Sequence, residues 1–168
     1  MNIQDIHLIY EYNYWANKKI LAASAGVSHA QFSALASFPY GGLHGTLFHT
    51  LEAEWSWRAL FQKIDDASEL LPADYPDLSA IEARWHVEET ALRAYLSKLR
   101  DEDMESHLHY TTDEGLHRDR ILWHCLLHVV NHGTQHRSEA AALLTEYGQS
   151  PGDLDFTVFL NEYNQAKE

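Results

Sequence analysis

Residues 121–147 read ILWHCLLHVVNHGTQHRSEAAALLTEY, and this stretch decides the fold. Its apolar residues recur every three or four positions, which predicts a long amphipathic helix over about residues 119–147. Gly148 follows directly, and glycine is the residue that most often ends a helix in the C′ position. Such a helix needs partners of similar length to bury its apolar face.

Three other segments have the same helical pattern. Residues 3–24 and 42–64 are predicted to be helices, and a heptad-like apolar seam from Leu78 to Leu99 predicts a third, with Ser79 as N-cap and Glu82 in the capping-box position. The four prolines all lie between these segments. Four long helices in one small chain predict an all-α fold, a four-helix bundle.

A short β-hairpin is expected before the last helix. The segments HLHYTT (107–112) and GLHRDR (115–120) flank the turn-forming residues Asp113, Glu114 and Gly115. Alternating segments around a glycine-containing turn are typical of a hairpin.

Composition restricts the function further. With 168 residues, 45% of them hydrophobic and 22% charged, the chain is expected to form a single packed domain over residues 1–168. Its net charge of −13 argues against nucleic-acid binding and against an anionic membrane surface, because both require clustered lysine and arginine. A lone cysteine, Cys125, and the lack of a signal-peptide pattern favour a cytoplasmic location.

The histidines are the unusual feature, since there are 12 of them. Four recur at intervals of four residues in the last helix: His124, His128, His132 and His136. On a helical wheel with Ile121 at zero, His132 at about 20° and His136 at about 60° share the apolar arc. His128 falls on the rim of that arc and His124 falls outside it, so a solvated helix face is favoured for both.

Two inward imidazoles one turn apart can hold one metal ion, provided that another helix supplies a third ligand. His49 is the best candidate by position, although its neighbours do not by themselves show that it faces inward. The alternative is a pair of core histidines that are satisfied by hydrogen bonds. No metal role is expected for the remaining histidines considered, which are His44, His107, His109 and His117.

Four stretches of the sequence together resemble the DinB family of bacterial metalloenzymes. They are YNYWANKKIL (12–21), LHGTLFHTLEAEWSW (43–57), LHVVNHGTQHRSEAAALL (127–144) and SPGDLDFTVFL (150–160). The resemblance implies a four-helix bundle, a homodimer and one divalent ion per chain, zinc or nickel, held by His49, His132 and His136. One departure is Ser138-Glu139, where many members have Gly-Gln.

Three neutral imidazoles leave a coordination position open, which is typical of a catalytic rather than a structural site. Such an ion lowers the pKa of a bound water or deprotonates a thiol. The chain is therefore expected to be a metal-dependent enzyme, a thiol S-transferase or hydrolase, whose partner is a small-molecule substrate or a low-molecular-weight thiol. The alternative is a non-catalytic, metal-binding stress-response protein in which the ion clamps two helices.

Several polar residues interrupt apolar stripes and are candidates to orient the imidazoles. They are Asn13, Asn17, Glu54, Glu88 and Glu139. The alternative is that each is hydrogen-bonded at the edge of the core or in a rim salt bridge. Cys125 is expected to be a buried structural thiol. The aromatic residues of segment 42–64 are expected in the core and on a dimer surface, with a substrate pocket as the alternative: Phe48, Trp55, Trp57 and Phe61.

Overall fold

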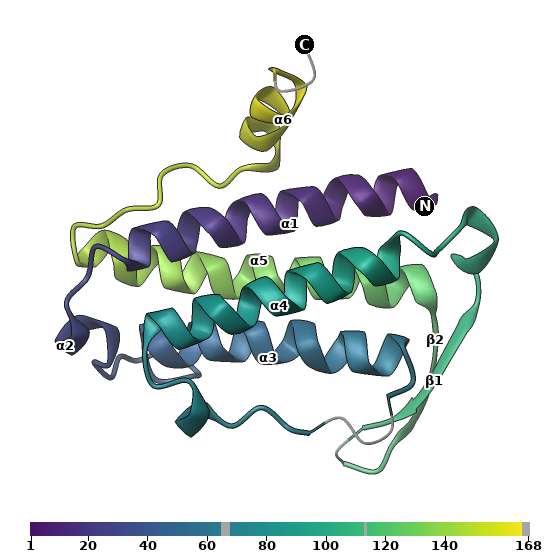
Figure 1. Ribbon diagram of the computed structural model, residues 1–168, viewed down its shortest axis with the longest axis horizontal. Coiled ribbons are helices and arrows are strands. Elements are labelled where there is room, and N and C mark those ends of the chain that lie inside the picture. Colours follow the sequence, from purple (N-terminus) through teal and green to yellow (C-terminus); the bar gives the residue numbers. More distant parts are fainter. Residues whose placement is uncertain (65–67, 113, 166–168) are drawn as a thin grey trace.

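The computed structural model describes residues 1–64, 68–112 and 114–165, and this part of the chain is mostly helical (Figure 1). The long helices are α1 (Ile3–Ser24), α3 (Leu43–Phe61), α4 (Leu78–Leu96) and α5 (Leu122–Glu146). Shorter elements are α2 (His29–Phe32), α6 (Phe156–Gln165) and the 3₁₀ turns η1 (Pro72–Asp74) and η2 (Asp101–Asp103).

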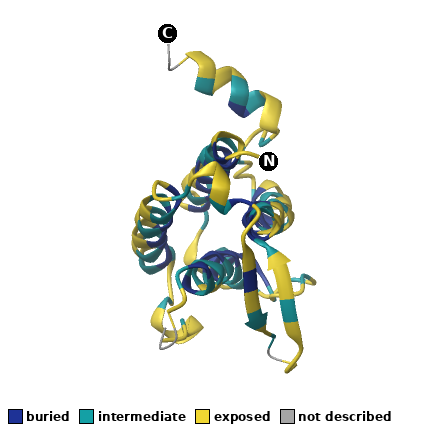
Figure 2. Cartoon of the chain, turned by 90° about the vertical axis from the view of Figure 1, so that its right-hand side faces the viewer, coloured by how far each residue is buried: buried dark blue, intermediate teal, exposed yellow. Residues whose placement is uncertain are grey.

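The four long helices lie side by side. In Figure 1, α1 and α5 run in one direction and α3 and α4 in the other. Helix α5 contacts α1 and α3, while α4 contacts the same two helices. Figure 2 views the helices end on, with their exposed residues mainly on the outer sides. The apolar stripes predicted from the sequence therefore face one shared interior.

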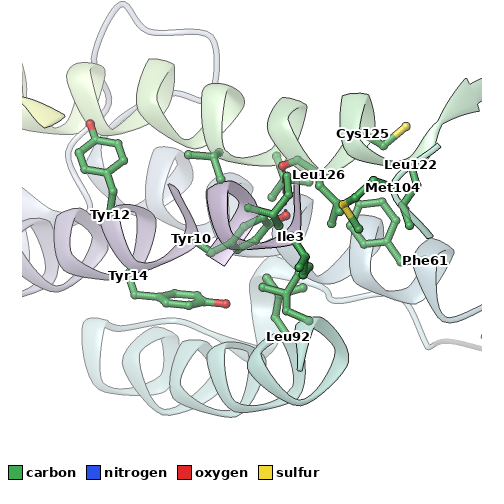
Figure 3. Packing of buried hydrophobic residues seen from close by; sticks show 14 of the residues in the cluster. Ile3, Tyr10, Tyr12, Tyr14, Phe61, Leu92, Met104, Leu122, Cys125 and Leu126 are labelled. Carbon is green, nitrogen blue, oxygen red and sulfur yellow. Dashed lines mark hydrogen bonds between the residues drawn. The ribbon is translucent and has the colours of Figure 1, made fainter. Parts of the chain in front are cut away.

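Two clusters of buried side chains fill that interior. The cluster nearer the hairpin includes Tyr10 of α1, Leu92 of α4 and Leu126 of α5 (Figure 3). The second cluster includes Ile20 of α1 and Leu143 of α5. Even the polar end of Tyr10 is satisfied, because its hydroxyl donates to the backbone oxygen of Leu126 at 3.1 Å.

Helix boundaries agree with the sequence patterns to within a turn. The predicted bounds of residues 3–24 match α1, whereas α3 is shorter than residues 42–64 and α4 ends before Leu99. The predicted N-cap of α4 is wrong, because Asp77 and not Ser79 occupies that position. The Asp77 side chain accepts a 2.9 Å hydrogen bond from the backbone nitrogen of Ala80, and Ser79 already lies inside the helix.

The hairpin lies where the sequence predicts it, directly before α5. Strands β1 (His107–Thr111) and β2 (His117–Ile121) pair antiparallel, with His107 opposite Ile121. Strand pairing therefore extends through residues 119–121, which the helical pattern assigned to the last helix, and α5 begins at Leu122. Of the predicted turn, Asp113 lies outside the described residues.

Helix α6 has no counterpart in the sequence prediction. It lies against α1, where the indole nitrogen of Trp15 donates to Glu162 at 2.7 Å. The chain leading to it is held by Tyr12, whose hydroxyl donates to the backbone oxygen of Leu154 at 3.0 Å. None of the helices in the described residues combines the length and the apolar character needed to cross a membrane.

Candidate metal centre

Three histidine side chains converge between α3 and α5. The Nε2 atom of His132 lies 3.2 Å from that of His49 and 3.2 Å from that of His136. One nitrogen from each ring lies within 4.8 Å of the others. His132 and His136 are one turn apart on the inner face of α5, and His49 reaches them from the antiparallel helix α3.

The shell around these rings is aromatic and partly closed. His136 is buried, and His49 and His132 are half-buried. Tyr40, in the loop before α3, stacks on His49 with ring centroids 3.6 Å apart and presents its ring to His136 at 5.3 Å. The stacking holds the His49 ring in one plane and excludes water from one of its faces.

Carboxylates lie beside the far nitrogens of two of the rings, and one of them is within hydrogen-bond distance. His136 Nδ1 lies 2.8 Å from Glu139 Oε2, and His49 Nδ1 lies 3.6 Å from Glu52 Oε2. A carboxylate can only accept, so the Nδ1 of His136 carries the proton and its Nε2 presents a lone pair to the cluster. This is the tautomer that a metal ligand requires.

The charge state of the central ring suits the same role. Burial, together with the neighbouring His136 and His49, lowers the pKa of His132 to about 4. The ring is therefore neutral at pH 7, the form that coordinates a metal. Three imidazole donors are a set that zinc, nickel and copper accept, so the residues present fit such an ion.

A comparison with protein families agrees with this geometry. The DinB family model matches residues 1–167. The chain belongs to the DinB family. A comparison with curated proteins finds no match.

Other histidines of this DinB protein lie outside the cluster. His128 packs against the ring of Trp57 with centroids 5.0 Å apart, and His124 is exposed. His44 Nε2 lies 2.7 Å from the backbone oxygen of Tyr75, and His107 Nδ1 lies 2.6 Å from Asp119. None of these lies in the three-histidine cluster, although His128 approaches His132 with ring centroids 5.8 Å apart.

Among the polar candidates, only Glu139 touches a histidine of the cluster. Glu88 instead pairs with Arg58 and Arg84, and its side chain is fully buried. Glu88 therefore lies in the interior of the protein. The alternative drawn from the sequence, a hydrogen-bonded residue at the edge of the core, does not describe its position.

Glu54, Asn13 and Asn17 form a separate buried network. Glu54 accepts hydrogen bonds from both asparagines, at 2.7 and 2.9 Å, and from the indole nitrogen of Trp85 at 2.8 Å. The asparagine oxygens in turn accept from Arg137, at 2.6 and 2.8 Å. Burial raises the pKa of Glu54, and the hydrogen bonds from Asn13, Asn17 and Trp85 oppose that shift. The network thus links the carboxylate of Glu54 to the guanidinium of Arg137 through the side-chain amides of Asn13 and Asn17.

Sequence reasoning missed Glu52, Tyr40 and Arg137. Glu52 had a usable signal, because it follows His49 by three residues as Glu139 follows His136. Tyr40 had none, since it lies in a loop whose path depends on the packed helices. Cys125 is buried, as expected, and burial raises its pKa, so its thiol is protonated at pH 7.

Proposed function

We propose that this DinB protein binds one divalent transition-metal ion, zinc or nickel, through His49, His132 and His136. The convergence of three Nε2 atoms from two helices is the observation that carries the proposal. Buried imidazoles without a partner are costly, and an ion would satisfy all three lone pairs at once.

We also propose that the fold is a four-helix bundle and that residues 1–168 form one domain. Its support is that each of α1, α3, α4 and α5 contacts two of the others around a shared core. Ligand sites in such bundles are built from side chains on facing helices, as here.

We further propose that the protein is an enzyme acting on a small molecule, with an open position at the ion. The metal-ligating cluster found in the described residues contains three histidines and no carboxylate or thiolate that would neutralise the ion. A bound ion of this kind supplies acidity to a water or a thiol. Glu139 keeps the proton on Nδ1 of His136, and Tyr40 shields His49 from water. Thiol S-transfer is favoured over hydrolysis by analogy alone, because the wider superfamily that the DinB family resembles includes thiol-dependent S-transferases.

Metal analysis tests the site. The triple variant His49→Ala/His132→Ala/His136→Ala, dialysed against zinc or nickel and then against buffer, should contain almost no metal, whereas the wild type should hold one ion per chain. His128→Ala is the matched control, and circular dichroism checks that each variant is helical. Full metal occupancy in the triple variant would overturn the assignment.

The metal spectrum tests the open position. Cobalt- or nickel-loaded protein should gain sulfur-to-metal charge-transfer bands when a low-molecular-weight thiol is added. If neither thiols nor small anions change the spectrum, the coordination sphere is closed and the enzyme proposal fails.

A non-catalytic role is the second candidate, because one ligand comes from α3 and two from α5. An ion there would tie the two helices together, as expected for a metal-binding stress-response protein. A closed coordination sphere with strong thermal stabilisation by metal would favour this role. A homodimer and a cytoplasmic location belong to both candidates.

A further inference from the structure

A cavity of about 510 Å³ lies beside the histidine cluster, between the hairpin, α3 and α5. Its lining residues are Trp57, Tyr110, Arg120, His124, Cys125 and His128. The volume falls within the range of small-molecule pockets in proteins.

His128 connects the cavity to the candidate metal centre. Its ring centroid lies 5.0 Å from that of Trp57 in the cavity wall and 5.8 Å from that of His132 in the cluster. A molecule in contact with His128 would therefore lie about one helical turn from His132, the nearest α5 histidine of the cluster.

The charge of the cavity is opposite to that of the whole chain. The net charge is −13 with histidine counted as neutral, and on the same count the lining carries one positive charge, that of Arg120, and no carboxylate. Across residues 1–64, 68–112 and 114–165, no hydrogen bond or ion pair engages the exposed Arg120 side chain, although, after the hydrogen bond from His107, its charge helps to lower the pKa of the adjacent Asp119. The adjacent Asp119 is on the other face of β2, where it meets His107. Arg120 is thus a cation available for an anionic ligand.

Two aromatic rings form an apolar corner in which a planar group can stack on one ring and meet the edge of the other. Trp57 and Tyr110 meet edge to face, with centroids 5.7 Å apart and an interplanar angle of 74°. A pocket that combines apolar aromatic walls with one well-placed charge fixes both the body and the orientation of a ligand.

A larger cavity of about 770 Å³, bordered by α1, α4 and α6, carries net negative charge, because four glutamates line it beside two cations, Lys18 and Arg93. Its arginine, Arg93, is already paired with Glu11 and Glu89, and further carboxylates, Glu82 and Glu162, line the wall. An anion entering there would meet net negative charge.

We propose that the cavity beside the cluster binds a small organic anion with a flat, apolar body, whose carboxylate pairs with Arg120 and whose body lies against Trp57 and Tyr110. The claim that this cavity is the enzyme's substrate pocket rests on the proposed function. The claim that the cavity binds such an anion does not depend on it. The substrate class is then an aromatic or similarly planar carboxylate.

Titration calorimetry with three probes of one shape tests the binding site. Benzoate should bind saturably to the wild type, while neutral benzamide and cationic benzylamine should bind at least about tenfold more weakly. Arg120→Gln should weaken benzoate binding by about tenfold or more. Arg100→Gln is the control, because Arg100 is an exposed arginine outside this cavity, and it should leave binding unchanged.

Equal binding of benzoate and benzamide, equal losses in the two arginine variants, or no saturable benzoate binding would each overturn the proposal. The His132→Ala variant separates it from the metal site. If that variant loses metal but keeps benzoate affinity, the pocket is independent of the ion. If the wild type binds benzoate but no metal, the pocket stands and the metal-enzyme proposal fails.

Discussion

His132, His136 and His128 are the same residue type on the same helix, and they differ in which side chains of α3 they face. The first two bring their Nε2 atoms within 3.2 Å of each other, whereas His128 rests against Trp57. Identical side chains at identical spacing thus have different environments because the helix rotates by about 40° over each four-residue step.

This difference predicts separable effects on metal content. His132→Ala and His136→Ala should each lose most bound metal, because two imidazoles rarely hold a divalent ion alone. His128→Ala should retain nearly all of it. Elemental analysis after dialysis measures the three variants in parallel. Loss in His128→Ala with retention in His132→Ala would place the ligands one turn earlier.

The contact between Glu139 and His136 gives a second residue-scale prediction. Glu139→Gln should lower metal affinity about 10- to 100-fold, because the carboxylate that holds the Nδ1 proton is lost. Glu52→Gln should have a smaller effect, since its 3.6 Å separation from His49 is longer than the 2.8 Å at His136. Competition with a chromophoric chelator measures both. A larger effect from Glu52→Gln would contradict the assigned contacts.

At the scale of the element, α5 has a glycine where alanine would be the better helix former. A Cβ atom on Gly133 would lie 2.7 Å from a guanidinium nitrogen of Arg137 and 3.1 Å from the side-chain oxygen of Asn13. Arg137 is held in place by its own hydrogen bonds. The glycine therefore lets α5 approach α1 closely.

We expect Gly133→Ala to destabilise the fold by about 1 kcal/mol or more, because disturbing a charged hydrogen bond outweighs the roughly 1 kcal/mol that alanine gains in a helix. Gln135→Ala, on the exposed face of the same helix, should change stability by less than about 0.5 kcal/mol. Urea unfolding measures both. A Gly133→Ala protein more stable than wild type would show that the guanidinium moves aside freely.

At the scale of the whole molecule, the buried network contacts all four long helices. Asn13 lies on α1, Glu54 on α3, Trp85 on α4 and Arg137 on α5. Both charged ends are almost inaccessible to solvent. Such a network fixes how the helices sit relative to one another, because sliding any one of them would leave a buried charge without its partners.

Removing the charge of Arg137 should therefore lower the free energy of unfolding strongly. Arg137→Met is expected to destabilise the protein by about 3 kcal/mol or more, since it leaves the buried Glu54 network uncompensated. Arg93→Met breaks the part-exposed pairs with Glu11 and Glu89 and should cost about 1 kcal/mol or less. Denaturant unfolding at pH 7 compares them, and equal losses would refute the special role of the network.

The proposed homodimer is the second prediction at this scale. Light scattering at micromolar concentration should return about twice the one-chain mass of 19.3 kDa. Phe48 and Phe61 are buried within one chain, and Trp55 and Trp57 are half-buried; because Trp57 lines the cavity beside the cluster, Trp55 is the α3 aromatic left for such a surface. A mass near 19.3 kDa would contradict the dimer.

The sequence by itself determined the features that depend on local periodicity. The bounds of α1, the hairpin before α5, the glycine after α5 and the inward direction of His132 and His136 all follow from spacing along one segment. At Gly148 the backbone adopts φ 75°, the left-handed conformation that its predicted position requires. These features are readable because side-chain direction repeats about every 3.6 residues in a helix and every two in a strand.

Only the tertiary structure decided what meets across helices. The stripe around His49 did not establish its direction, and nothing local paired Glu54 with Asn13 and Asn17 or placed Tyr40 on His49. Those contacts depend on which turns of two helices lie opposite each other, and that register is set by packing of the whole core rather than by any one segment. The spacing of the histidines is local, whereas the site that three of them form is not.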